Sequence, residues 1–242
     1  TSFEVQGGDG ATYYASEYDS IDEMMEAKVA LTEDLTDEGI VLLKNNGALP
    51  LAGNGKVTAL GRGSVDLIYA GASGAGIIGN VGTGINATLK EGLEAAGFSV
   101  NPTMWDFYSN SGVSRINGGA GGNSGYAIGE VPLSSYPDDK GYDDYGDAAI
   151  VVLTRNSGES NEAPSGEFND GEVYYRLNQD ERDLIEEAKG NFDTVVVIAN
   201  SPSAMELDEL NDDEQIDAIL QCGGLGMSGA KSLGSILAGT VN

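Results

Sequence analysis

A long polar segment between Arg155 and Tyr175 holds the side chains best suited to chemistry. It begins R-N-S-G-E-S-N-E-A-P-S-G-E-F and directly follows an unbroken apolar run, residues 148–154. A carboxyl group can act as a general acid or base when it reaches a sheltered cleft that raises its pKa. Glu159 follows Gly158 and is placed to project from such a loop. The spacing alone favours the other interpretation, a surface glutamate among the 39 acidic residues.

Two further polar segments also follow apolar runs. Gly61-Arg62-Gly63-Ser64 is similar to the start of a dinucleotide-binding fingerprint. The third glycine of that fingerprint would fall at Asp66, however, and no helix pattern follows at once, so we favour a tight turn. Asn200 offers an amide that either hydrogen-bonds a sugar hydroxyl or caps a helix starting near Ser203, and we favour the cap.

Charge and composition exclude several classes of function. The formal charge is −27, which repels nucleic-acid backbones and anionic lipid, so we expect neither as a partner. The chain has no histidine, which excludes a Ser-His-Asp triad, a Cys-His pair and the usual zinc sites within it. We expect no metal and no cofactor. A single cysteine, Cys222, and no visible signal peptide slightly favour the cytoplasm.

Helix and strand signals alternate along the chain. Capping boxes begin helices at Ser20 (S-I-D-E) and Asn178 (N-Q-D-E), and Gly97 stands where a left-handed residue ends a helix. Apolar spacing predicts helices over residues 21–38, from 86 or 88 to 96, from 102 through 107, 178–189 and 227–238. Apolar runs predict strands over residues 40–43, 56–60, 98–100, 148–154, 194–199 and 216–220.

This alternation predicts an α/β three-layer sandwich: a mostly parallel sheet of about six strands with helices on both faces. We interpret residues 1–20 as an irregular lead-in and residues 21–242 as one domain. Ligands of such sheets bind beyond the carboxyl ends of the strands. The segments that begin at Gly61, Arg155 and Asn200 all leave strands in that direction.

Several blocks of sequence resemble one known family. The run E-G-I-V-L-L-K-N-N-G-A-L-P-L and the following K-V-T-A-L-G are similar to the entry and first core strand of the α/β sandwich domain of family 3 glycoside hydrolases, the β-glucosidase family. Y-A-G-A-S-G-A-G resembles that family's Gly- and Ser-rich loop. D-A-A-I-V-V-L-T-R-N-S-G-E resembles its strand leading into a Ser-Gly-Glu acid/base loop, and later blocks follow in the family's order.

The resemblance implies a domain of a retaining, exo-acting β-glycosidase that hydrolyses O-glycosidic bonds. In the family a TIM-barrel domain supplies an aspartate nucleophile and the sandwich supplies the acid/base glutamate, here Glu159, with the two carboxyls about 5 Å apart across the domain interface. We expect the neighbouring residues Arg155, Ser157, Gly158 and Glu162 to contact the carbohydrate substrate. The barrel is absent from this chain, so the chain alone should be inactive.

Two other functions stay open. The family usually has Gly and Asp where this chain has Ser160 and Glu162, a departure that motivates a non-catalytic carbohydrate-binding module. The G-R-G-S segment motivates a nucleotide-binding α/β domain.

Overall fold

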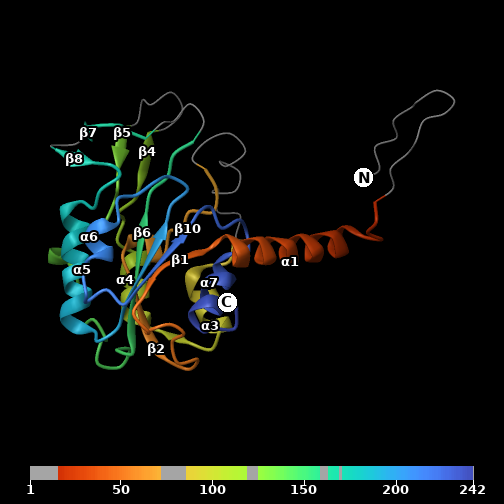
Figure 1. Cartoon of the computed structure of the whole chain (residues 1–242), viewed down its shortest axis with the longest axis horizontal. Helices are drawn as coiled ribbons and strands as arrows, with labels where there is room; N and C mark the ends of the chain where they lie inside the picture. The colour runs from red at the N-terminus through yellow and green to blue at the C-terminus, as the bar shows by residue number, and fades with distance from the viewer. Residues whose placement is uncertain (1–15, 72–85, 119–124, 159–162, 169–170, 242) are drawn as a thin grey trace.

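The computed structural model describes residues 16–71, 86–118, 125–158, 163–168 and 171–241. Its centre is a six-stranded sheet in the order β1-β10-β9-β6-β2-β3 (Figure 1). These strands are β1 (Val41–Asn45), β2 (Lys56–Leu60), β3 (Ser99–Val100), β6 (Ala148–Thr154), β9 (Val195–Asn200) and β10 (Ala218–Cys222). Edge strand β1 is antiparallel to β10, and every other neighbouring pair is parallel, so the predicted sheet is confirmed.

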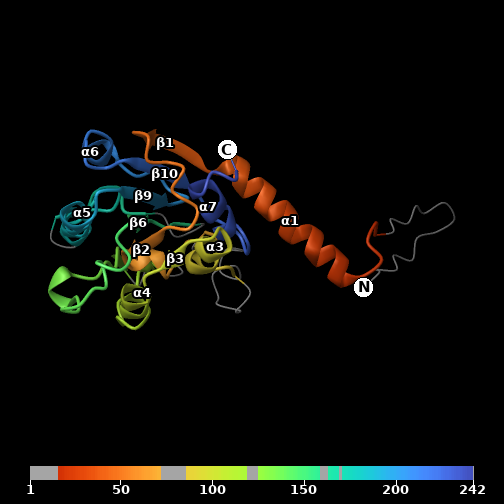
Figure 2. The ribbon, with the colours of Figure 1, turned by 90° about the horizontal axis from the view of Figure 1, so that it is seen from below.

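Helices cover both faces of this sheet (Figure 2). One face carries α3 (Leu89–Ala95) and α7 (Ala230–Leu237), and the other carries α4 (Pro102–Ser109), α5 (Gln179–Asn191) and α6 (Asp208–Asn211). Consecutive residues of β6 point to opposite faces, so that Ile150 and Val152 join one core cluster while Val151 and Leu153 join the other. A strand buried on both faces needs no polar residue, which explains the unbroken apolar run.

The helix starts follow the predicted capping chemistry. Asn178 and Thr88 each accept a hydrogen bond from the backbone of the third helical residue, Glu181 or Glu91, whose side chain bonds back to complete a capping box. Gly97 ends α3 with a φ of +98°, as predicted.

Some element boundaries differ from those predicted. Helix α7 begins at Ala230 rather than residue 227, and β10 lies two residues later than the predicted strand over 216–220. The region between α4 and β6 contains one short hairpin, β4 (Ile116–Gly118) with β5 (Gly125–Ala127), and the polar segment after β6 contains another, β7 (Glu167–Phe168) with β8 (Glu172–Val173). Strands this short leave too few residues for an alternation pattern to be recognised.

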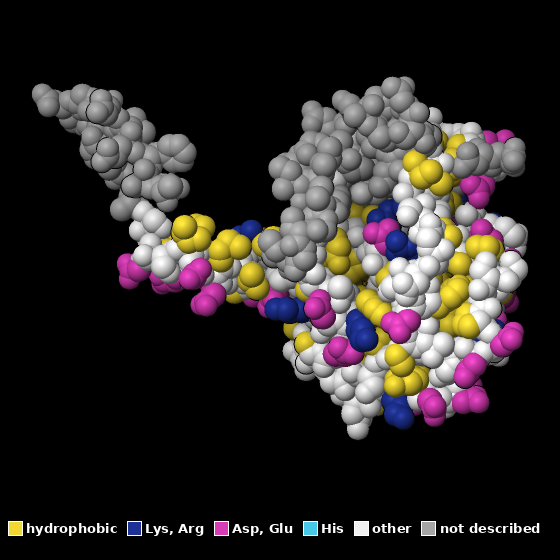
Figure 3. All heavy atoms as spheres, turned by 180° about the vertical axis from the view of Figure 1, so that it is seen from behind, with side chains coloured by type: hydrophobic (Ala, Val, Ile, Leu, Met, Phe, Trp, Pro, Cys, Tyr) yellow, Lys and Arg dark blue, Asp and Glu magenta, His cyan; other side chains and the backbone are white. Residues whose placement is uncertain are grey.

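Helix α1 (Ile21–Gly39) begins at the predicted Ser20 cap but contributes no buried residue. Its C-terminal part rests on α7 and the loop before it, where Ser232 and Ser228 donate hydrogen bonds to the carbonyl oxygens of Glu33 and Val29. Its first half extends away from the sheet (Figures 1 and 2), and Figure 3 shows hydrophobic side chains along it. The apolar stripe includes Ile21, Leu31 and Leu35, all more than half exposed. The spacing correctly predicted a helix, but no element among the described residues covers this stripe. No helix in the described part of the chain is both long and apolar enough to cross a membrane.

Helices α3 and α7 approach closely through two glycines. A Cβ atom on Gly92 would lie 2.1 Å from the carbonyl oxygen of Ala230, and one on Gly234 would lie 2.0 Å from the carbonyl oxygen of Gly92. Both distances are far below van der Waals contact, so any side chain here must push the two helices apart.

A buried carboxyl group, that of Glu130, organises the turn after β2. Gly61 has a φ of +87° and leads into a short 3₁₀ turn, η1 (Arg62–Ser64). Both carboxylate oxygens of Glu130 accept the backbone N–H of Arg62 at 3.0 Å, and one also accepts that of Val131 at 2.8 Å. Burial raises the pKa of Glu130 to about 8, although these N–H groups oppose the shift.

The close approach of α3 and α7 at Gly92 predicts that a single added methyl group destabilises the domain. Gly92→Ala should lower the free energy of unfolding by about 1–3 kcal/mol through overpacking, even though alanine gains up to ~1 kcal/mol of helix propensity. Gly190→Ala in α5 is the matched control, because nothing lies within 4 Å of the added Cβ there. Urea unfolding measures both, and equal stabilisation of the two variants would contradict the helix contact.

The raised pKa predicts a pH-dependent stability. Folded Glu130 keeps its proton up to about pH 8, whereas in the unfolded chain it loses it near 4.5, so its contribution to stability falls as pH rises between these values. Glu130→Gln removes this titration. The stability of the variant relative to wild type should therefore increase steadily in urea unfolding from pH 5 to pH 8.5. A difference that stays constant over this range would exclude a raised pKa.

Candidate functional site at the carboxyl edge of the sheet

The loops that leave β2, β6 and β9 meet at one edge of the sheet, as predicted, and the loop that leaves β10 joins them. Asn200, the last residue of β9, joins three of them. Its side-chain oxygen accepts the N–H of Ile68, and its amide nitrogen donates to the carbonyl oxygen of Gly223 at 2.7 Å. The predicted helix cap is therefore wrong: no helix begins at Ser203, α6 begins at Asp208, and the buried Asn200 amide binds loop backbone instead.

The segment after β6 joins the same group of loops. The Oγ atoms of Ser157 and Ser203 lie 2.7 Å apart, and the side-chain amide of Asn156 donates to the carbonyl oxygen of Ala70 at 3.3 Å. Ser157 and Gly158 are both partly buried at this edge. The predicted catalytic residue Glu159 and the predicted substrate contact Glu162 lie outside the described residues.

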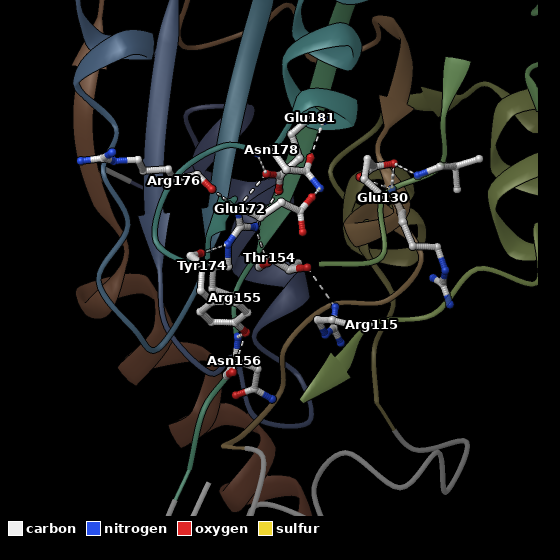
Figure 4. A network of polar contacts seen from close by, with 12 residues as sticks. Arg115, Glu130, Thr154, Arg155, Asn156, Glu172, Tyr174, Arg176, Asn178 and Glu181 are labelled. Atoms are coloured by element: carbon white, nitrogen blue, oxygen red, sulfur yellow. Dashed lines mark hydrogen bonds and ion pairs between the residues drawn. The ribbon is translucent and has the colours of Figure 1, made fainter. Parts of the chain in front are cut away.

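Arg155 is placed differently from the partly buried Ser157 and Gly158. It is fully buried, and its guanidinium forms a two-pronged ion pair with Glu181, at 2.6 Å and 2.7 Å (Figure 4). The remaining N–H groups donate to backbone carbonyls of Thr154, Tyr174 and Arg176. Burial disfavours the charged guanidinium, but Glu181 outweighs this and the pKa of Arg155 is raised. With every donor bonded inside the domain, Arg155 has none left for a sugar.

Tyr174 closes the segment that contains the predicted acid/base glutamate. Its hydroxyl donates to the carbonyl oxygen of Asn156 at 2.7 Å and accepts the N–H of the same residue at 2.8 Å. Its buried ring packs edge-on against Tyr126 and Phe168. Both ends of the segment between Asn156 and Tyr174 are thus held at one point of the domain (Figure 4).

Two further arginines, Arg62 and Arg115, lie near the end of β6 and share one carboxylate. Arg115 binds the carboxylate of Asp66 at 3.2 Å and donates to the hydroxyl of Thr154 at 3.0 Å, while Arg62 approaches the same carboxylate at 3.7 Å. Burial lowers the pKa of Arg115, and Asp66 opposes this shift. These contacts connect the turn after β2 to the end of β6.

The geometry of the G-R-G-S turn argues against a phosphate site. The N–H of Arg62, which a bound phosphate would use, already binds the Glu130 carboxylate. The turn continues into three residues of 3₁₀ helix rather than a long helix with a free N-terminus. A Cβ atom on Gly61 or Gly63 would meet the carbonyl oxygen of Val152 at 2.8 or 2.6 Å, so both glycines serve close packing on β6.

The described residues contain no cluster of three or more His, Cys, Asp or Glu side chains that could hold a metal ion. Cys222 is buried at the end of β10, and burial raises the pKa of its thiol to about 12. Such a thiol stays protonated at neutral pH and is unsuited to nucleophilic chemistry.

The sequence reasoning missed the roles of Glu181, Tyr174 and Asn156. The sequence pattern identifies Glu181 only as a capping residue, but Glu181 both caps the helix and pairs with Arg155. One of its carboxylate oxygens accepts the N–H of Asn178 and also binds the Arg155 guanidinium. The one available signal was an arginine directly after a fully apolar strand, since a buried charge at such a position requires an acidic partner.

Comparisons with known proteins agree on one family. The Glycosyl hydrolase family 3 C-terminal domain matches residues 40–242. A β-glucosidase from Paenibacillus barengoltzii is similar over 89% of this chain and 23% of its own, with 27% identity and a TM-score of 0.70. β-Glucosidase 3B from Thermotoga neapolitana, solved in complex with glucose, is similar over 90% of this chain and 30% of its own, with 22% identity and a TM-score of 0.71.

No curated protein matches the chain. The chain spans less than a third of the length of the solved structures named above, whose remaining residues have no counterpart in it. The matched region begins at residue 40, directly after α1 (Ile21–Gly39), and includes every strand of the sheet. From this match over most of its length, the chain belongs to glycoside hydrolase family 3, as a C-terminal domain of that family.

Proposed function

We propose that this domain supplies the general acid/base carboxyl of a retaining, exo-acting β-glucosidase, with Glu159 as that residue. An aspartate nucleophile on a TIM-barrel domain of the same polypeptide completes the site, so the chain alone is inactive. The observation that carries this proposal is the placement of the segment between Asn156 and Tyr174. It leaves the carboxyl end of the central strand β6, where ligands of parallel sheets bind, and both its ends are held.

The proposed chemistry divides the work between two carboxyl groups. The barrel aspartate attacks the anomeric carbon while Glu159 protonates the leaving oxygen, and Glu159 then deprotonates the water that hydrolyses the glycosyl-enzyme. A group that must reach across a domain boundary suits a loop beyond a strand end better than a strand or helix. Ser157, Gly158 and Glu162 stay proposed substrate contacts, whereas we assign Arg155 to the support of the loop.

β-Glucosides are the proposed substrate class. The Paenibacillus barengoltzii and Thermotoga neapolitana proteins are β-glucosidases, and the latter was solved with glucose bound. An exo-β-xylosidase shares the fold at 18% identity, with a TM-score of 0.54, so the fold itself is compatible with a second sugar.

The test replaces Glu159 in the polypeptide that joins this domain to its barrel. Glu159→Ala should lower kcat/KM for phenyl β-glucoside, a substrate with a poor leaving group, by about 10²–10⁴-fold, because protonation of that leaving group is lost. The first step with 2,4-dinitrophenyl β-glucoside needs little acid catalysis, so this substrate should still form the glycosyl-enzyme and show a burst of released 2,4-dinitrophenol. Steady-state kinetics measure the loss with phenyl β-glucoside, and rapid-mixing kinetics measure the burst.

The matched control is Glu167→Gln, which removes an exposed carboxylate on the same segment. It should leave both substrates near wild type. Turnover of phenyl β-glucoside by Glu159→Ala at the wild-type rate would refute the acid/base role. Calorimetry of the 242-residue chain with simple glucosides tests the alternative, since a non-catalytic binding module predicts tight binding and the proposed function predicts weak binding at most.

A further inference from the structure

We propose that the buried Arg155–Glu181 ion pair and the Tyr174 hydroxyl are positioning groups for the acid/base carboxyl, an inference that rests on the proposed function. Neither touches substrate. Together they fix where the Glu159 segment leaves the domain and where it returns (Figure 4).

The ion pair joins three parts of the chain at one point. Arg155 binds the carbonyl oxygens of Thr154 at the end of β6, of Tyr174 and of Arg176 on the returning segment. Its partner Glu181 lies in the first turn of α5, where it also accepts the N–H of Asn178. The end of the strand, the returning segment and the start of the helix therefore cannot move independently.

The shape of the guanidinium is essential to this arrangement. Arginine presents its donors in a fixed planar fork that matches a carboxylate, whereas lysine has a single ammonium group that cannot reproduce the fork. Arg155 is 0% exposed and Glu181 1% exposed, so no water competes for these bonds. Burying such a pair is costly and contributes little to stability by itself, which agrees with a role in geometry.

The Tyr174 hydroxyl sets the starting point of the segment. It binds both the N–H and the carbonyl oxygen of Asn156, which fixes the orientation of that peptide as well as its location. Glu159 follows three residues later in the sequence, and three residues of chain span at most about 10–11 Å. An acid that is misplaced by about 1 Å loses up to ~100-fold in rate, so a small shift of the anchor should be visible in catalysis.

The first experiment is Tyr174→Phe in the barrel-containing polypeptide, which keeps the ring and removes the hydroxyl. We expect kcat/KM for phenyl β-glucoside to fall by about 10- to 100-fold, with 2,4-dinitrophenyl β-glucoside within about twofold of wild type. A purely structural defect lowers the active fraction and so reduces both substrates equally. The selective loss is therefore the signature of a misplaced acid.

Tyr175→Phe is the matched control for this variant. Tyr175 is the adjacent residue and its ring packs edge-on against Tyr174, but its hydroxyl makes no hydrogen bond among the described residues. Both substrates should stay near wild type. A selective loss in this control as large as in Tyr174→Phe would remove the special role of the Tyr174 hydroxyl.

The ion pair is tested separately by Arg155→Lys, with Arg182→Lys as its control. Arg182 also forms a two-pronged ion pair from α5, to Glu209, but this pair is exposed and touches neither end of the segment. Arg155→Lys should show the same selective loss as Tyr174→Phe, and Arg182→Lys should show none. Should Arg155→Lys fail to fold, the Tyr174 result decides the proposal.

A second measurement uses the 242-residue chain without any barrel. The Tyr174→Phe change frees the Asn156 amide, whose hydrogen exchange should speed up by at least about tenfold while the amides of β6 stay protected. Unchanged exchange at Asn156 would overturn the positioning role.

The two proposals fail in different ways. If Glu159→Ala leaves turnover of phenyl β-glucoside unaffected, the proposed function itself is wrong. If Glu159→Ala shows the selective loss, but Tyr174→Phe and Arg155→Lys reduce both substrates equally, the acid/base role stands and the positioning role is refuted.

Discussion

Burial of β6 on both faces is the constraint on which the rest of this domain depends. All seven of its residues are buried, with alternate side chains in two separate cores. A strand in this position cannot carry a reactive group along its length, because a charge in either core would be unpaired. Chemistry is therefore confined to the point where the strand ends, and the residues directly after Thr154 must change from apolar to polar.

That change brings a charge into the interior at once, since the buried Arg155 directly follows Thr154, the last residue of the strand. The domain neutralises the charge with Glu181, which accepts two of the guanidinium N–H groups, and satisfies the other three with backbone carbonyls. An apolar residue would be easier to bury. The arginine instead joins the end of a strand, the returning loop and the start of a helix through its side chain. Its burial is costly, but it fixes the position at which the chain leaves the sheet.

Much of the fold could be predicted from local patterns. Apolar runs located the six strands of the sheet, and the cap residues Ser20 and Asn178 located two helix starts, although only Asn178 forms the complete capping box. These features depend on residues a few positions apart. The carboxyl edge depends on residues far apart, such as Arg155 with Glu181 or Asn200 with Ile68 and Gly223, and spacing along a single sequence holds no record of such pairs. Resemblance to a family, rather than periodicity, selected Glu159 from the 39 acidic residues.

Helix α1 extends away from the sheet and leaves its apolar side chains exposed, which affects how copies of the isolated chain interact in solution. Its apolar stripe would favour self-association, yet the chain carries a formal charge of −27, with acids on the same helix. Mutual repulsion at neutral pH and low salt keeps copies of the chain apart. Salt screens this repulsion and acid reduces the net charge, so we expect either condition to favour association of copies through the first helix.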